Sequence, residues 1–188
     1  MIGYAFCGSF CTISKSIKIL RELAAEGNDI LPIVSDAVYT TDTRFGKACD
    51  TVAEIERICK KKVLHTIVEA EPIGPKGFLD VLIISPCTGN TLAKIACGIT
   101  DTSVTMAAKA QLRSGKPVVI ALASNDALSA NLQNISRLTV RKNIYFVPMF
   151  QDDTENKPDS LICDFNELKA TVVSALRGKQ LQPIWCVK

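Results

Sequence analysis

Short apolar runs alternate along this chain with segments of helical periodicity, and this alternation is the feature that most constrains its fold. We predict five strands, at residues 2–6, 30–34, 80–84, 118–123 and 144–149. Their residues do not alternate between apolar and polar, so both faces of each strand are expected to be buried. Strands separated by helices predict an α/β fold: a three-layer, doubly wound, Rossmann-like arrangement around a mainly parallel sheet.

The helical segments are bounded by residues that favour helix ends. A first helix is expected to end near Glu26, where Gly27 follows, and further helices are predicted at residues 50–61 and 164–177. The stretch 35–77 has the weakest pattern, which allows a short strand near residues 63–66. No composition shift marks a boundary, so we predict a single domain over residues 1–188 with a short C-terminal tail from about residue 179.

Charge and hydropathy exclude several functional classes. The chain has 22 Lys and Arg residues against 19 Asp and Glu, a net charge of +3, which is too small a basic excess for a typical nucleic-acid-binding protein. The longest apolar stretch, residues 117–123, is far too short for a membrane span, and the first basic residue, Lys15, comes late for a secretory signal. We therefore expect a cytoplasmic protein without nucleic-acid or membrane partners.

Eight cysteines lie among apolar residues in a chain that is large enough to fold without disulfides. We expect most of them to be reduced, buried and hydrophobic in character. The closest pair, Cys7 and Cys11, has no second close pair or histidine-rich stretch beside it, as a structural zinc site would require. No metal site is predicted.

Three polar loops each follow a predicted strand and precede a helix. Ligands of such folds bind at the carboxyl ends of the strands, and helix N-termini there favour anions. Serine, threonine and asparagine are also the preferred helix caps, so each loop alone has a purely structural explanation. Three such loops at one sheet edge favour a nucleotide or flavin phosphate site, and its predicted cofactor-binding residues are Gly8, Ser9, Ser85, Thr88, Asn90, Thr91, Ser124 and Asn125.

Other catalytic motifs are weak or absent. The chain has neither a Gly-x-Gly-x-x-Gly nor a Gly-x4-Gly-Lys-Ser/Thr sequence, which argues against a standard dinucleotide site and an ATP-hydrolysing P-loop. The single histidine, His65, follows three lysines and is interpreted as a surface residue rather than a general base. Asp152 and Asp153 fit a solvated turn better than a paired-carboxylate or metal site. No catalytic residue is identified by these patterns.

The loops carry a resemblance to a known family. Residues 7–9 (CGS), 85–94 (SPCTGNTLAK) and 124–128 (SNDAL) resemble the flavoprotein family, whose members include FMN-dependent cysteine decarboxylases and flavin prenyltransferases. The resemblance implies FMN as cofactor and a homo-oligomeric assembly. Residues 123–126 replace the Pro-x-Met-Asn segment of the decarboxylases, and no histidine base matches theirs, which argues against cysteine decarboxylation.

Further segments narrow the resemblance to the dipicolinate synthase B subunits of spore-forming bacteria: 43–46 (TRFG), 71–75 (EPIGP), 107–110 (AAKA), 151–153 (QDD) and 182–184 (QPI). This implies the oxidation of dihydrodipicolinate to dipicolinate in the mother cell, together with an A subunit that binds NADP. Recognition of two substrate carboxylates would fall to basic side chains, for which Arg44, Lys109 and Arg113 are the candidates. The alternatives are a stand-alone FMN-dependent decarboxylase or prenyltransferase and a cofactor-free scaffold for the A subunit.

Overall fold

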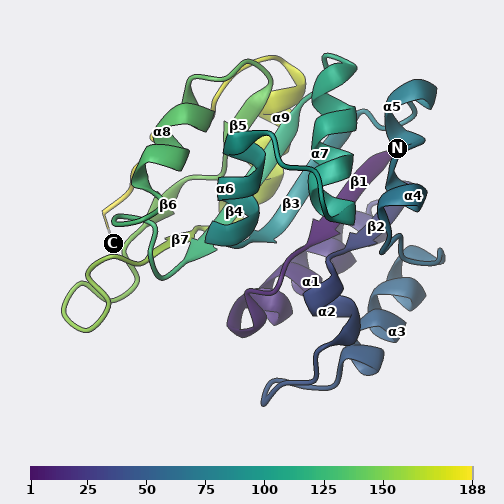
Figure 1. The fold of residues 1–188 in the computed structure, drawn as a ribbon, viewed down its shortest axis with the longest axis horizontal. Helices are drawn as coiled ribbons and strands as arrows, with labels where there is room; N and C mark the ends of the chain where they lie inside the picture. The colour runs from purple at the N-terminus through teal and green to yellow at the C-terminus, as the bar shows by residue number, and fades with distance from the viewer. Residues whose placement is uncertain (188) are drawn as a thin grey trace.

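A seven-stranded sheet forms the centre of the computed structural model, which describes residues 1–187 (Figure 1). Its order is β2-β1-β3-β4-β7-β6, and β5 pairs with β4 beside β7. The strands that form the parallel part are β1 (Ile2–Phe6), β2 (Ile30–Val34), β3 (Val81–Cys87), β4 (Val118–Ser124) and β5 (Ile144–Phe146). Two short antiparallel strands complete the sheet: β6 (Met149–Phe150) and β7 (Leu161–Cys163).

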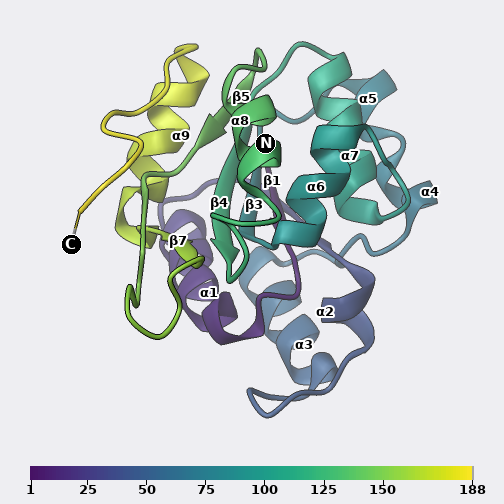
Figure 2. The same ribbon diagram turned by 60° about the vertical axis from the view of Figure 1, so that its left-hand side comes forward.

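Helices cover both faces of the sheet, which makes the three layers that the sequence predicts. One face carries α1 (Phe10–Ala25), α2 (Asp36–Thr40), α3 (Ala48–Cys59) and α9 (Leu168–Leu176), the last preceded by a 3-10 turn, η1 (Phe165–Glu167). The other face carries α4 (Ile67–Ala70), α5 (Ile73–Lys76), α6 (Gly89–Cys97), α7 (Ser103–Arg113) and α8 (Leu132–Thr139). Figure 2 shows α1 and α9 on one side of β3 and β4, and α6 and α7 on the other.

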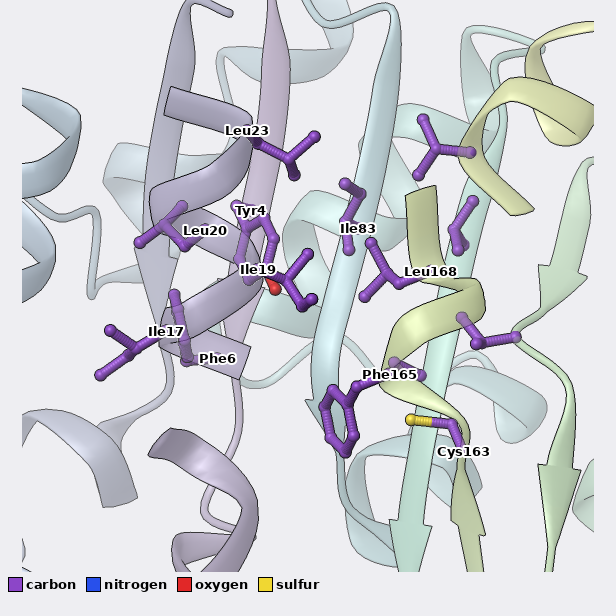
Figure 3. Packing of buried hydrophobic residues seen from close by; sticks show 14 of the residues in the cluster. Tyr4, Phe6, Ile17, Ile19, Leu20, Leu23, Ile83, Cys163, Phe165 and Leu168 are labelled. Carbon is purple, nitrogen blue, oxygen red and sulfur yellow. The ribbon is translucent and has the colours of Figure 1, made fainter. Parts of the chain in front are cut away.

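Successive side chains of the central strands point to opposite faces of the sheet, which divides the core into two apolar layers. Tyr4 and Phe6 of β1 point to the α1 side, whereas Ala5 and Cys7 point to the α6 side, and all four are buried. Figure 3 shows Tyr4 beside Leu20 of α1 on the first of these faces. Burial of one such large side chain stabilises the fold by about 1.5–3 kcal/mol, so these faces specify how α1 sits on the sheet.

The predicted strands are confirmed, but β3 continues to Cys87, three residues past its predicted end, and two other regions also differ. The run at residues 144–149 is interrupted after Phe146, because Val147 still donates to Ile120 while Pro148 has no N–H to continue the ladder. The chain then turns away to form β6 against β7, a three-residue strand whose sequence carried no signal. The weakly patterned stretch 35–77 contains α2, α3, α4 and α5, and its expected short strand is a single bridge between Leu64 and Ile33.

The C-terminal tail packs along the sheet edge. The side chain of Gln180 accepts a hydrogen bond from the Phe146 N–H at 2.8 Å and donates one to the Phe146 carbonyl at 2.7 Å. The N–H of Met149 donates to the carbonyl of Ile184, and the carbonyl of Met149 accepts from the N–H of Cys186, so Met149 pairs with the segment around Trp185. These contacts extend the sheet edge beyond β6.

All eight cysteines are free, and only three of them, Cys7, Cys87 and Cys163, are buried. The expectation that most would be buried is therefore wrong, because Cys11, Cys49 and Cys97 lie on outward-facing positions of their helices. Within residues 1–187 no helix is long and apolar enough to cross a membrane. The same described residues contain no cluster of three or more metal-ligating side chains.

Candidate functional site

A pocket of about 670 Å³ opens at the carboxyl edge of the parallel strands. The loops that follow β1, β3 and β4 meet there, because parallel neighbours end at the same edge of a sheet. The turn at residues 43–46 and the segment between β6 and β7 contribute to its walls. This volume lies within the usual range for small-molecule and cofactor sites.

Most of the predicted cofactor-binding residues line this pocket. They are Gly8, Ser9, Thr88, Asn90, Ser124 and Asn125, and Arg44 lines it as well. The expectation that they share one pocket is confirmed, while their contact with a cofactor stays a prediction.

Ser85 and Thr91 do not line the pocket, so the expectation of a shared pocket is wrong for Ser85, while the contact of Thr91 with a cofactor stays a prediction. Strand β3 continues to Cys87, which places Ser85 inside the sheet, fully buried, with its hydroxyl 2.9 Å from the hydroxyl of Ser16. Thr91 lies in the first turn of α6, where its N–H donates to the Thr88 hydroxyl at 3.2 Å. Both side chains serve the fold rather than the pocket surface.

Lys109 and Arg113 lie in a separate pocket of about 400 Å³ between α6, α7 and Arg141, which shares no lining residue with the first. The direction of α7 explains this position. Its first residue, Ser103, donates to the carbonyl of Val34 at the carboxyl edge, so its last turns lie toward the opposite edge. Within one chain these two side chains therefore do not join Arg44, and their contact with substrate stays a prediction.

The N-terminus of α1 presents an anion-binding end to the pocket. This 16-residue helix has no acidic residue in its first turn, so the positive end of its dipole is not neutralised there. The Thr12 hydroxyl donates to the Ser9 carbonyl at 2.9 Å and approaches the Ser9 hydroxyl at 3.0 Å, which orients both side chains. A Cβ at Gly8 would lie 3.2 Å from the Cβ of Ala37, so the loop packs closely on the start of α2.

Ser35 is a further candidate that the sequence patterns missed. It follows β2 directly, and its N–H donates to the Phe6 carbonyl, which places it beside the end of β1. Among the buried side-chain nitrogens and oxygens of residues 1–187, its hydroxyl is the one atom without a hydrogen-bond partner. An unsatisfied buried hydroxyl is costly, and a bound ligand group would satisfy it. Its position directly after a strand, which it shares with the three polar loops, could have identified this residue.

A polar cluster lies at the N-terminus of α6. The Asp126 carboxylate accepts hydrogen bonds from the Ser124 hydroxyl and, at 3.0 Å, from the Asn131 amide. A Cβ at Gly89 would lie only 2.5–2.7 Å from polar atoms of these three side chains, so this first residue of α6 has to be glycine. The positive end of α6 therefore faces a carboxylate of the protein itself.

The turn at residues 43–46 presents a cation and an aromatic ring at its tip. Thr43 and Gly46 exchange two backbone hydrogen bonds of 3.0 and 3.1 Å, which close the turn. The guanidinium of Arg44 lies 4.9 Å from the centre of the Phe45 ring, and that ring is 55% exposed. A planar guanidinium beside an exposed aromatic ring suits the recognition of a planar carboxylate.

Asp152 and Asp153 have separate roles. Asp152 lines the pocket, where its carboxylate accepts from the Ser160 hydroxyl at 2.9 Å and lies 3.6 Å from the Lys157 ammonium. Asp153 accepts from Asn156 within its own exposed turn, and these N–H groups lower the pKa of its carboxyl. The two aspartates do not form a joint site, in agreement with their interpretation as a turn.

His65 takes no part in this pocket. Its ring stacks on Tyr39 at 3.9 Å, and its Nδ1 atom lies 3.3 Å from the Glu69 carboxylate. The Glu69 carboxylate also accepts from the backbone N–H groups of His65 and Thr66, which lowers its pKa. The histidine thus belongs to the capping structure of α4.

The pocket residues fit FMN. The α1 N-terminus and the hydroxyls of Ser9 and Thr12 line the pocket and offer donors of the kind that bind a phosphate ester. The orphaned hydroxyl of Ser35 does not line the pocket, but it follows β2 at the same sheet edge, beside the end of β1, and is a further donor.

Comparisons with known proteins agree with this geometry. The sequence profile of the family described as Flavoprotein matches residues 1–177. The B subunit of dipicolinate synthase from Bacillus subtilis (strain 168) is 43% identical over 183 residues, which are 97% of this chain and 92% of that protein.

Solved structures show the same similarity. The crystal structure of the dipicolinate synthase B subunit from Bacillus halodurans superposes with a TM-score of 0.91 at 42% identity, covering 100% of this chain and 96% of that one. Burkholderia xenovorans DmrB, solved in complex with FMN as a cubic protein cage, has a TM-score of 0.69 at 19% identity, covering 94% of each chain. At that identity the likeness shows the shared fold alone.

Proposed function

The chain belongs to the flavoprotein family, and on that premise we propose that it is the B subunit of a dipicolinate synthase. In this role it binds FMN and takes part in the oxidation of dihydrodipicolinate to dipicolinate together with an A subunit. The observation that carries the proposal is the 43% identity to the Bacillus subtilis B subunit over 97% of the chain. The reaction would take place in the cytoplasm of the mother cell of a spore-forming bacterium.

The residues at the carboxyl edge supply the proposed FMN site. Gly8 and Ser9 directly precede α1, at whose N-terminus the phosphate would bind. Ser35 lies beside the end of β1 and would offer its unpartnered hydroxyl from the same sheet edge. Thr88, Asn90, Ser124 and Asn125 would contact the remainder of the cofactor. When bound, FMN supplies a two-electron acceptor.

The nicotinamide cofactor, NADP, is assigned to the A subunit. This chain lacks the Gly-x-Gly-x-x-Gly sequence that cradles a dinucleotide pyrophosphate, which supports that division of labour. Electrons removed from the substrate in this pocket would then pass to the partner polypeptide. The pocket opens beside solvent-exposed turns, such as residues 43–46, which leaves a face where a partner could approach.

Arg44 is the proposed clamp for a substrate carboxylate. Its guanidinium lines the pocket and can bind a carboxylate through two parallel hydrogen bonds. Phe45 beside it would cover one face of the planar ring. Lys109 and Arg113 would contribute to this site only across a contact between two copies of the chain, since they lie in a different pocket of the same chain. The cage formed by DmrB supports a homo-oligomer.

Reconstitution tests the proposal. The purified chain is mixed with the A subunit, dihydrodipicolinate and NADP, and dipicolinate is followed by its absorbance. Flavin is followed separately through the visible spectrum and through the quenching of added FMN fluorescence. We expect product only when both polypeptides are present, and FMN bound to this chain.

Each alternative predicts a different result. A colourless chain that binds no FMN yet supports synthesis would be a scaffold. A chain that binds FMN but gives no product with the A subunit would favour a stand-alone flavin enzyme. Either result would overturn the corresponding part of the proposal.

A further inference from the structure

We propose that Asp126 is the base that accepts the substrate proton during ring oxidation. This inference rests on the proposed function, because it assigns a role within that reaction. Aromatisation of a dihydropyridine requires the loss of one hydride and one proton, and the proton needs an acceptor in the pocket. The sequence patterns identified no such residue.

The Asp126 carboxylate lies at the pocket surface and is held in one orientation. It lines the pocket together with Ser124 and Asn125. One of its oxygens accepts from the Ser124 hydroxyl, and the other accepts from the Asn131 amide at 3.0 Å. A carboxylate has about four lone-pair sites, so both oxygens keep acceptor capacity for a substrate hydrogen.

Buried groups behind the carboxylate support this orientation. Asn131 is 5% exposed, its N–H donates to the Asp126 carbonyl at 3.1 Å, and its amide oxygen accepts from Asn134 at 3.0 Å. On the other side, the Cα of Gly89 approaches so closely that no Cβ fits beside the carboxylate. A group fixed from two sides in this way is pre-organised for proton transfer.

The other titratable groups of the pocket are less suited to this role. Lining side chains with ionisable groups are Cys11, Arg44, Asp126, Asp152 and Lys157. Asp152, the second carboxylate, is already engaged within its own segment, with the Ser160 hydroxyl at 2.9 Å and the Lys157 ammonium at 3.6 Å. Asp126 has no ion pair with any cation of residues 1–187.

The proposed step is balanced in atoms and electrons. One ring C–H bond breaks, and its hydrogen leaves as hydride with both electrons to the two-electron acceptor, a flavin or a nicotinamide. The proton at the neighbouring ring position passes to the Asp126 carboxylate, and the electron pair it leaves behind forms the new ring double bond. Asp126 then returns this proton to water, which restores the carboxylate.

The variant Asp126→Asn tests this role with little structural change. The new amide oxygen can still accept from Asn131, and the new amide nitrogen can donate to the Ser124 oxygen, since a hydroxyl both donates and accepts. Asp152→Asn removes the competing carboxylate of the same pocket. Both variants are assayed as full chains with the A subunit, and FMN fluorescence quenching and thermal unfolding check that each is folded.

We expect kcat to fall roughly 100-fold or more in Asp126→Asn, within the range for loss of a general base, while FMN affinity stays within about threefold. A loss of kcat confined to Asp152→Asn, or Asp126→Asn with ordinary kcat, would overturn the assignment. Absence of product with the unaltered polypeptides would instead overturn the proposed function.

Binding of the product gives a readout that does not depend on turnover. Dipicolinate is a dianion, so an ionised Asp126 should repel it, and calorimetry should show roughly tenfold tighter binding to Asp126→Asn. In Asp152→Asn the Lys157 charge loses its partner, so any gain there has a different origin and should vanish when Lys157 is also changed to methionine. Equal affinity of Asp126→Asn and the unaltered chain would place the carboxylate away from the ligand.

Discussion

Replacement of Gly89 by alanine should destabilise the protein and disturb the pocket together. The added Cβ would lie 2.5 Å from the Ser124 hydroxyl, 2.6 Å from the Asn131 amide nitrogen and 2.7 Å from an Asp126 oxygen. Contacts this short cannot be kept, so the loop after β4 has to move away from α6. That movement separates the groups that now hold the Asp126 carboxylate.

The size of the effect follows from two opposing contributions. Alanine in place of glycine favours a helix by up to about 1 kcal/mol. Hydrogen bonds to a charged group contribute about 1.5–3 kcal/mol each, and two of them meet Asp126. The Asp126 carboxylate is half-exposed, so water can form hydrogen bonds in place of part of those that are lost. We therefore expect a net destabilisation of about 1–3 kcal/mol. For a chain of this size that lowers Tm by about 3–10 °C.

Urea unfolding at fixed protein concentration measures this cost. The control Asn90→Ala places alanine one residue further along the same helix, at an exposed position, and should change stability by less than about 0.5 kcal/mol. Ser124→Ala removes the atom of the shortest contact, so the double variant Gly89→Ala/Ser124→Ala should cost less than the sum of the single variants. A Gly89→Ala protein as stable as the unaltered chain would refute the close packing of this loop on α6.

Three further predictions concern the clamp, the core and the thiols. Arg44→Lys keeps the charge but loses the bidentate fork, so kcat/KM with the A subunit should fall roughly ten- to hundredfold at nearly unchanged Tm; full activity would move the carboxylate contact elsewhere. Tyr4→Phe should cost about 1–2 kcal/mol in urea unfolding, because the buried hydroxyl of Tyr4 donates to the Ser16 carbonyl. Burial raises the pKa of Tyr4, so this tyrosine stays neutral in the folded state. Its contribution to the free energy of unfolding is therefore present below about pH 10 and is lost as pH rises further. The difference in free energy of unfolding between the unaltered protein and Tyr4→Phe should shrink above that pH, and a constant difference would contradict the burial. Ellman's reagent should react fast with the three exposed cysteines, which are Cys11, Cys49 and Cys97, and with all eight only after unfolding; fast reaction of a buried thiol would show that the core opens.

Much of the architecture could be predicted from local patterns. A run such as residues 2–6, apolar on both faces, has few stable places other than the middle of a covered parallel sheet. Gly27, with a φ of +83°, ends α1 where the sequence places the stop. The polar loops at the carboxyl edge follow from the same patterns, because strand direction alone brings their ends together.

Other features depended on where elements meet in space. Ser85 has the same polar character as Ser9, yet β3 continues past it and takes its side chain into the core. Lys109 and Arg113 are basic like Arg44, but their helix runs away from the edge that Arg44 reaches. Residue type and local pattern do not encode these differences.

Arg44 and Asp126 illustrate the physical reason. Arg44 lies in a stretch without periodicity, where two backbone hydrogen bonds between Thr43 and Gly46 form a turn that hydrophobic pattern does not report. Asp126 and Gly89 are 37 positions apart in the sequence, and only the packing of α6 against the loop after β4 brings them into contact. Local sequence determines which elements form, because their energies depend on near neighbours. Which side chains share a pocket is decided by contacts between distant segments, and these exist only once the sheet and its helices have packed.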